Sequence, residues 1–166
     1  MIKLDGKIIN QEHLPDNSLR IEPINDSSLD LSFMGMTTTK RITWYYENDS
    51  ELFTIICLRK HFANKEMILE MPYCPHARMD RVKNNNELFT LKHFADVINS
   101  LEFSEVRIWD PHSNVCTALI DNVNVFTPIN EVQKTIKEIN STNLIAFYPD
   151  EGAMKRGTSY LTGAYA

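Results

Sequence analysis

Short apolar runs separated by polar residues and turn signals lie along the first forty residues and favour β-structure. Asp5-Gly6 separates two short apolar runs, MIKL and KII, and this dipeptide favours a tight hairpin turn. Further short strands are predicted at 19–24, 29–34 and 40–47. We therefore expect the amino-terminal part of the chain to consist mainly of β-structure.

A helix is predicted after this region, in the segment NDSELFTIICLRKHF. Asn48 is a suitable N-cap, Glu51 follows three residues later, and apolar residues recur at helical spacing. The next segment, KEMILEMPY, is a short apolar run and is predicted to be a buried strand.

From residue 90 onward, predicted helices and strands alternate regularly. Thr90 is expected to cap a helix over 90–101, and Thr127 with Pro128 to begin another. The remaining predicted elements are strands at 105–110, 123–126 and 143–150, a short helix from Ser113 or Asn114 to Ile120, and a helix in GAMKRGTSYL. This alternation predicts an α/β fold with a mostly parallel sheet flanked by helices on both faces.

Composition narrows the class of protein. The chain has 166 residues, 43% of them hydrophobic, and a formal net charge of −5. This is enough apolar material for a real core, and the acidic balance argues against a dedicated nucleic-acid-binding protein. We see no run of about 18 apolar residues and no signal-peptide pattern, so no membrane partner is expected. The three cysteines lack CxxC spacing, which fits free thiols in the cytoplasm.

Polar residues of several chemical types follow three of the predicted strands. They are His76, Arg78, Asp80 and Arg81 after the first, Asp110, His112, Ser113 and Asn114 after the second, and Asp150 and Glu151 after the third. The carboxyl ends of parallel strands meet at one edge of a sheet, where α/β proteins bind their ligands. We therefore expect these loops to surround one crevice.

The residue types in these loops indicate a ligand with phosphate groups. Arginine side chains are permanently charged and match phosphate oxygens. A carboxylate with an imidazole can help to hold a Mg²⁺ ion that bridges phosphates. Neither GxxxxGK[ST] nor GxGxxG is present, so the common nucleotide-binding loops are excluded.

Plainer interpretations stay open for each loop. Arg78, Asp80 and Arg81 also fit a surface ion-pair cluster, His112 a residue that caps the following helix, and Asp150 an N-cap. A second chemical interpretation is a zinc site built from Cys74 and His76 with His112 and Cys116, although the first pair is spaced more tightly than usual.

Three stretches of the chain resemble the ribose-phosphate pyrophosphokinase family, also called phosphoribosyl pyrophosphate synthetases. MPYCPHARMDR resembles the family's ARQDR-like stretch after a strand, RIWDPHS its Asp-x-His strand end, and FYPDEGAMKR its PDAGG-like turn with a Lys-Arg pair. TLKHFADVINSLEFSEV resembles the helix between the first two. The resemblance covers about residues 66–157.

The resemblance implies a role for each matched position. Arg78, Met79, Asp80 and Arg81 correspond to the ATP-binding stretch, and His112 to the family's catalytic, metal- and ATP-associated histidine. Asp150 corresponds to the aspartate that contacts Mg²⁺ and the ribose phosphate. Family members transfer pyrophosphate from Mg·ATP to ribose 5-phosphate, have two domains of the type I phosphoribosyltransferase fold, and form homodimers or larger homo-oligomers.

The chain also departs from the family pattern. Met79 stands where the family has glutamine, and SFMGMTTT lacks the acid of the family's adenine-binding loop. We expect residues 1–142 to form the amino-terminal domain and 143–166 the start of a second, similar domain that is cut short. The family's basic catalytic loop and its ribose 5-phosphate loop would lie beyond this point, so little activity is expected of the chain alone.

Two other functional classes remain open. Met79 and the missing acidic loop favour a non-catalytic relative that acts in assembly or regulation. A phosphoribosyltransferase, which consumes the pyrophosphorylated sugar, would share the same fold.

Overall fold

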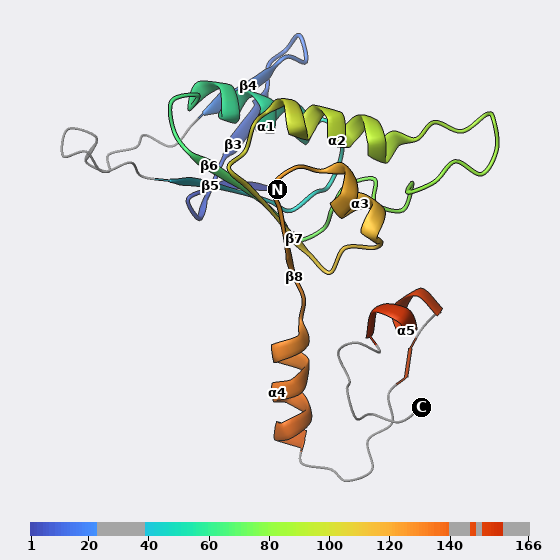
Figure 1. Cartoon of the computed structure of the whole chain (residues 1–166). Coiled ribbons are helices and arrows are strands. Elements are labelled where there is room, and N and C mark those ends of the chain that lie inside the picture. The colour runs from blue at the N-terminus through green and yellow to red at the C-terminus, as the bar shows by residue number, and fades with distance from the viewer. Residues whose placement is uncertain (23–38, 140–146, 149–150, 158–166) are drawn as a thin grey trace. The chain divides into compact units, whose positions relative to one another are not determined.

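The computed structural model describes residues 1–22, 39–139, 147–148 and 151–157. The chain divides into two compact units, Met1–Phe126 and Thr127–Ala166 (Figure 1). The larger unit contains the sheet and the first three helices, and the smaller one contains the last two helices.

A six-stranded sheet with the order β2-β1-β5-β6-β7-β8 forms the centre of the larger unit. Its strands are β1 (Ile2–Leu4), β2 (Lys7–Ile8), β5 (Lys40–Trp44), β6 (Met67–Met71), β7 (Glu105–Trp109) and β8 (Val123–Phe126). The last four run parallel, and β1 is antiparallel to both of its neighbours. The predicted mostly parallel sheet is therefore confirmed. A separate hairpin consists of β3 (Asn10–His13) and β4 (Leu19–Glu22).

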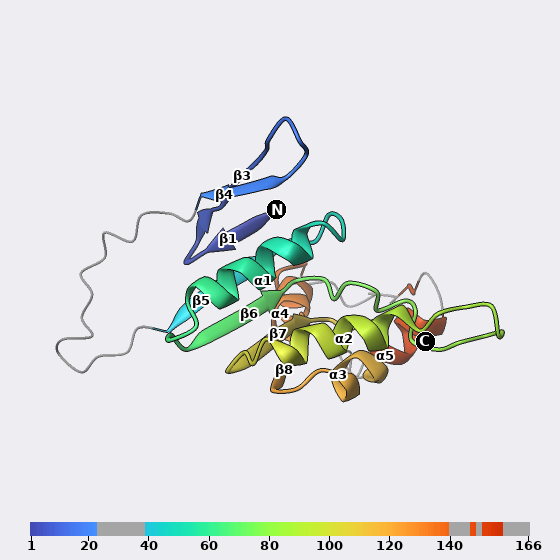
Figure 2. The ribbon, with the colours of Figure 1, turned by 90° about the horizontal axis from the view of Figure 1, so that it is seen from above.

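The three crossovers between the parallel strands are α1 (Glu51–His61), α2 (Thr90–Ser100) and α3 (Asn114–Leu119). The parallel strands lie side by side in chain order. Because such crossovers are right-handed, sequential order places all three helices on one face of the sheet. Figure 2 shows α1 and α2 lying over the sheet on the same side. In the described part of residues 1–126, the expectation of helices on both faces is therefore not met.

The core lies between this face and the helices. Alternate strand residues point into it and are almost completely buried: Ile42 and Trp44 on β5, Met67, Leu69 and Met71 on β6, and Val106 and Ile108 on β7. The helices contribute a matching set, which includes Ile55, Leu58, Leu91, Phe94, Ile98 and Cys116. Burial of these apolar side chains is the main source of stability for this unit.

The other face of the sheet is polar. One residue from each of five strands is paired in register across it, in the order Lys3, Thr43, Glu70, Arg107, Asn124. Glu105 accepts hydrogen bonds of 2.8 Å from both Arg107 and Asn124. Parallel strands usually carry apolar residues on both faces. Along β5, β6 and β7, buried residues alternate with more exposed ones, so this sheet buries mainly one face.

The hairpin at Asp5-Gly6 is confirmed, with φ of 50° and 82° at the two turn residues. The helix capping was predicted less well. Phe89, not Thr90, precedes α2, and α1 begins at Glu51, after Ser50 instead of Asn48. The strand predicted at 29–34 lies outside the described residues, as does most of the one at 143–150.

The smaller unit contains α4 (Ile129–Ile139) and α5 (Glu151–Gly157). The NH of Val132 donates to the carbonyl of Pro128, which agrees with the predicted helix start at Thr127-Pro128. The domain boundary expected at residue 142 lies outside the described residues. Among the helices that the structure describes, none is both long and apolar enough to cross a membrane.

Candidate functional site at the carboxyl edge of the sheet

The loop after β6 carries the predicted ATP-binding stretch, and buried residues anchor it. Cys74 and Ala77 are 2% and 1% exposed. The NH of Ala77 donates to the carbonyl of Cys74, and the NH of Met79 to that of His76, at 2.8 Å. His76 adopts a left-handed conformation with φ of 60°, which histidine tolerates better than most residues. These hydrogen bonds fix the backbone of the turn, and the Arg78 side chain on it is exposed.

His76 joins this loop to the loop after β5. Its Nε2 lies 2.9 Å from Oδ1 of Asp49, and the same oxygen accepts a 2.8 Å hydrogen bond from the hydroxyl of Tyr46. That hydrogen bond raises the pKa of Tyr46 because the phenol is held as a donor, and burial adds to the effect. The ring of Phe94 lies 5.5 Å from that of His76. These contacts hold the turn from two sides.

The charged residues of the loop do not form the surface ion-pair cluster that we considered. Arg78 is exposed and makes no hydrogen bond or ion pair with another described residue. Arg81 approaches Asp80 only to 3.9 Å, and the Arg81 side chain is 78% exposed. Such a pair contributes little to stability. The Arg78 guanidinium therefore keeps its donors available for a ligand.

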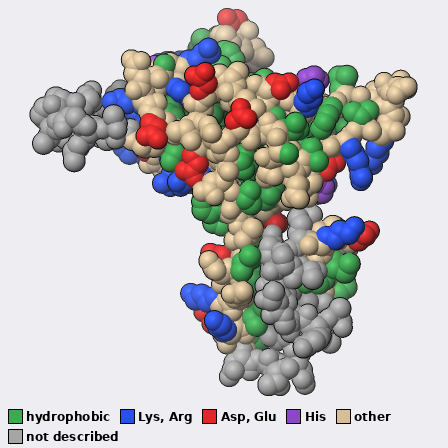
Figure 3. Space-filling view, in the orientation of Figure 1, with side chains coloured by type: hydrophobic (Ala, Val, Ile, Leu, Met, Phe, Trp, Pro, Cys, Tyr) green, Lys and Arg blue, Asp and Glu red, His purple; other side chains and the backbone are tan. Residues whose placement is uncertain are grey.

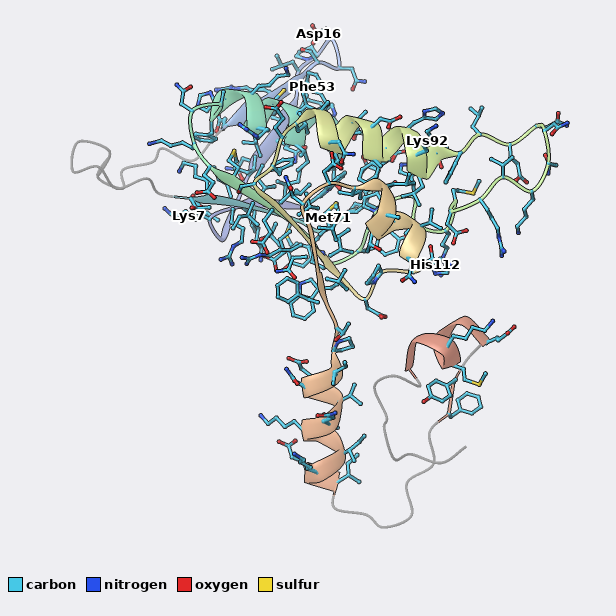
Figure 4. All side chains as sticks on the ribbon, in the orientation of Figure 1. Lys7, Asp16, Phe53, Met71, Lys92 and His112 are labelled. Carbon is cyan, nitrogen blue, oxygen red and sulfur yellow. The ribbon has the colours of Figure 1, made fainter. Side chains whose placement is uncertain are left out.

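The loop after β7 carries the predicted catalytic histidine. Asp110 follows the strand with φ of 41°, and its NH donates to the carbonyl of Phe126 at the end of β8. His112 is exposed and lies just before α3 (Figure 4). The N-cap of α3 is Ser113, so the interpretation of His112 as the capping residue is wrong.

A sulfur contact joins the loop after β6 to α3, the helix that follows the loop after β7. Sγ of Cys74, in the loop after β6, lies 2.7 Å from Sγ of Cys116 in α3. Because β6 and β7 are adjacent and parallel, Arg78 and His112 follow neighbouring strand ends. Asp150 lies outside the described residues, so its role and its place beside the other two stay predictions.

The zinc interpretation is not supported. Cys74 and Cys116 do meet, but His76 is bound to Asp49. Across the described ranges, no group of three or more His, Cys, Asp and Glu side chains has an arrangement that would hold a metal ion. The two sulfurs thus form a pair without the nitrogen ligands that a tetrahedral zinc site requires.

The surface around these loops has mixed charge. On the face shown in Figure 3, acidic and basic side chains are interspersed over the larger unit. A ligand at the carboxyl edge would therefore be recognised by individual side chains and not by a broad field of one sign.

The loop after β5 also belongs to this edge, and its residues were not among the predicted site residues. Asp49 lies in a short polar stretch that we interpreted as a helix cap, and Tyr46 in a predicted strand. The signal that was available is positional, because β5 is parallel to β6 and its loop must therefore open at the same edge.

Comparison with known proteins places this edge in context. No family model matches the chain. A ribose-phosphate pyrophosphokinase of Ureaplasma parvum is 28% identical over 176 aligned residues, which cover 98% of this chain and 53% of the relative. One of Mycoplasma pneumoniae is 29% identical over 118 residues, or 66% of this chain and 34% of the relative. The chain is a relative of the ribose-phosphate pyrophosphokinases.

A solved structure supports the fold. The phosphoribosylpyrophosphate synthetase of Mycobacterium smegmatis aligns with a TM-score of 0.71 over 95% of this chain and 53% of that protein, at 14% identity. The chain thus has the phosphoribosyltransferase-like fold of the pyrophosphokinases. It spans about half the length, or less, of the curated relatives that it matches.

Proposed function

We propose that the carboxyl edge of this sheet binds the polyphosphate of Mg·ATP through Arg78 and His112. The observation that carries the proposal is the exposed Arg78 guanidinium, which makes no ion pair with a described residue and projects from a turn fixed by buried neighbours. An arginine held in this way can donate to phosphate oxygens without first leaving a protein partner. Met79, Asp80 and Arg81 would line the rest of the nucleotide site.

The reaction that we propose for the whole polypeptide is transfer of pyrophosphate from Mg·ATP to ribose 5-phosphate. The named relatives support this assignment. Asp150 would contact the ribose phosphate, and both Asp150 and His112 would lie near the metal. Phosphoryl transfer depends on positioned charge, so we expect residues 1–166 alone to have little activity without the loops found elsewhere in the family.

Mg²⁺ would arrive with the nucleotide. It takes oxygen ligands, keeps several waters and needs only one or two protein carboxylates. Among the described residues, no three His, Cys, Asp or Glu side chains are grouped so that they could hold a metal ion. When bound, the ion would neutralise developing charge on the phosphates. We also propose a cytoplasmic location and a homodimer or larger homo-oligomer.

Calorimetric titration of the chain with Mg·ATP tests the site. Arg78→Ala and His112→Ala should each weaken binding by about tenfold, since a charge-assisted hydrogen bond contributes roughly 1.5 kcal/mol. Arg20→Ala and His93→Ala are matched controls, because Arg20 lies on the separate hairpin and His93 is exposed on α2. Equal binding by all four variants would contradict the assignment.

A non-catalytic role in assembly or regulation is the alternative, and the methionine at position 79 favours it because a thioether cannot replace the hydrogen bonds of an amide. Absence of Mg·ATP binding by the unmodified chain would support this alternative. A phosphoribosyltransferase would instead be identified by analysis of the products of a longer polypeptide.

A further inference from the structure

We propose that Cys74 and Cys116 form a reversible disulfide that ties the loop after β6 to α3. The two sulfurs belong to residues 42 positions apart in sequence, yet they lie 2.7 Å apart. A disulfide bond is about 2.05 Å long, so they need to approach by only roughly 0.6 Å. Both residues are free thiols in the structure.

The bond would join the two loops of the proposed site. Arg78 lies four residues after Cys74, and His112 lies four residues before Cys116. A covalent link at this point would fix the backbone that leads to each of these side chains. The existence of the bond does not depend on the proposed function, whereas any effect on Mg·ATP does.

The chemistry requires an oxidant, and a peroxide is small enough to act in this setting. The thiolate of Cys116 attacks a peroxide oxygen, the O–O bond breaks, and hydroxide leaves to give a sulfenic acid. The sulfur of Cys74 then attacks this sulfur, the S–O bond breaks, and hydroxide leaves with the thiol proton as water. Two thiols and one hydrogen peroxide thus give one disulfide and two waters.

The environment assigns different roles to the two sulfurs. The hydrogen bond to Cys116 raises the pKa of Cys74, and burial raises it further. Either sulfur can be the donor of this hydrogen bond, and the same contact lowers the pKa of Cys116. These directions favour Cys116 as the sulfur that attacks the oxidant, and the same disulfide forms whichever sulfur reacts first.

Burial makes the oxidation slow but does not prevent it. Cys74 is 2% exposed and Cys116 is 0% exposed, so a peroxide reaches them only when the loop after β6 opens locally. Closure of the loop brings the second sulfur next to the oxidised one before further oxidation occurs. A bond formed in this way is of the transient, redox-sensing kind found in reducing compartments.

The third cysteine provides a control within the same chain. Cys57 is partly buried on α1, and no contact places it near the other two. After treatment with hydrogen peroxide, peptide mapping without reductant should give a linked peptide containing Cys74 and Cys116, with Cys57 unlinked. The intact mass should fall by two hydrogens and return with dithiothreitol. Cys57→Ser should behave in the same way, whereas Cys74→Ala and Cys116→Ala should give no linked peptide.

Two further measurements show whether the bond acts on the site. The oxidised chain should melt about 5 °C higher or more, because a crosslink of this span restricts the unfolded chain. Amide hydrogen exchange in residues 74–81 and 112–116 should be slower in the oxidised chain than in the reduced chain. The Cys57→Ser variant should show the same difference.

Peptide mapping of the unmodified chain decides the proposal without any variant. Three unlinked thiols after peroxide treatment would overturn it, as would links that involve Cys57 or sulfinic acids at Cys74 and Cys116 without a link between them. Mg·ATP titration of reduced and oxidised chains is a separate experiment. If neither form binds, the proposed function fails while the disulfide stands.

Discussion

Nε2 of His76 lies 2.9 Å from Oδ1 of Asp49, and this contact joins two loops at the carboxyl edge whose residues are 27 positions apart in sequence. Asp49 precedes α1, and His76 forms part of the turn that presents Arg78. Asp49 also accepts a hydrogen bond from the hydroxyl of Tyr46, so one carboxylate oxygen contacts both His76 and Tyr46. The position of the arginine therefore depends on a residue outside its own loop.

A double-mutant cycle tests this contact. His76→Asn introduces a residue that also tolerates the left-handed backbone, but its shorter side chain does not reach Asp49. Asp49→Ala removes the acceptor. The two substitutions should show a coupling of about 0.5–1 kcal/mol in urea unfolding, as expected for a partly exposed side-chain hydrogen bond. Tyr46→Phe removes the other hydrogen bond to the same oxygen, so its effect should also couple to Asp49→Ala. Additive effects of His76→Asn and Asp49→Ala would show that the contact contributes nothing.

Glu51 should make the stability of the larger unit depend on pH. It is 5% exposed. Its carboxylate accepts hydrogen bonds from the indole of Trp44 at 2.9 Å and the NH of Glu47 at 2.8 Å, and it contacts the amino group of Met1. Burial acts to raise its pKa, but these three donors outweigh burial and leave the pKa below its ordinary value of 4.5.

A group whose pKa is lower in the folded state stabilises the fold at pH values above its ordinary pKa. The contribution of Glu51 should therefore be complete above pH 4.5 and should be lost as the pH falls through the lowered pKa. Glu51→Gln should cost about 1–3 kcal/mol at pH 7 and progressively less in acid, measured by urea unfolding across pH. Glu47→Gln is the matched control, because that side chain is 67% exposed. A cost for Glu51→Gln that does not change with pH would contradict the assignment.

Neighbouring residues of β6 should differ sharply in their tolerance to substitution. Leu69 is completely buried beneath the helices, whereas Ile68 points to the polar face. Leu69→Ala should destabilise the chain by about 2–5 kcal/mol because it leaves a cavity in the core. Ile68→Ala should cost about 1 kcal/mol, since the neighbours on its face include Arg41 and Glu105. Equal costs in thermal unfolding would mean that both faces of the sheet are covered in solution.

Much of this fold could be predicted from periodicity, and the failures have physical causes. The strands of the parallel sheet and the helices between them follow from apolar spacing alone. The expectation of helices on both faces was wrong for the larger unit. The strands KRITW and EVRIW alternate buried with more exposed residues, and this alternation is typical of a sheet that buries one face. Two helix starts were misplaced, by two residues for α1 and by one for α2, which is the usual uncertainty of a helix end.

The candidate site was only partly accessible to sequence reasoning. Arg78 and His112 could be placed at one edge because they follow parallel strands. The left-handed turn at His76 was hidden because no glycine marks it. The pairing of Cys74 with Cys116 depends on how α3 packs, which residue spacing does not reveal.

Met79 is the position at which a substitution should increase nucleotide binding. Its NH is fixed by the hydrogen bond to the carbonyl of His76, and its side chain is partly exposed next to Arg78. The family has a glutamine there, whose amide can both donate and accept hydrogen bonds, whereas a thioether is only a weak acceptor. Met79→Gln should therefore strengthen Mg·ATP binding by about fivefold in calorimetry, the equivalent of one hydrogen bond of roughly 1 kcal/mol.

Val82→Gln is the matched control, because Val82 is an exposed apolar residue of the same loop. It adds the same amide three residues further on and should leave the affinity unchanged. The gain from Met79→Gln should also shrink in an Arg78→Ala background, since the arginine helps to hold the nucleotide next to the amide. If Met79→Gln weakens binding, or if Val82→Gln strengthens it equally, the nucleotide does not lie against this turn.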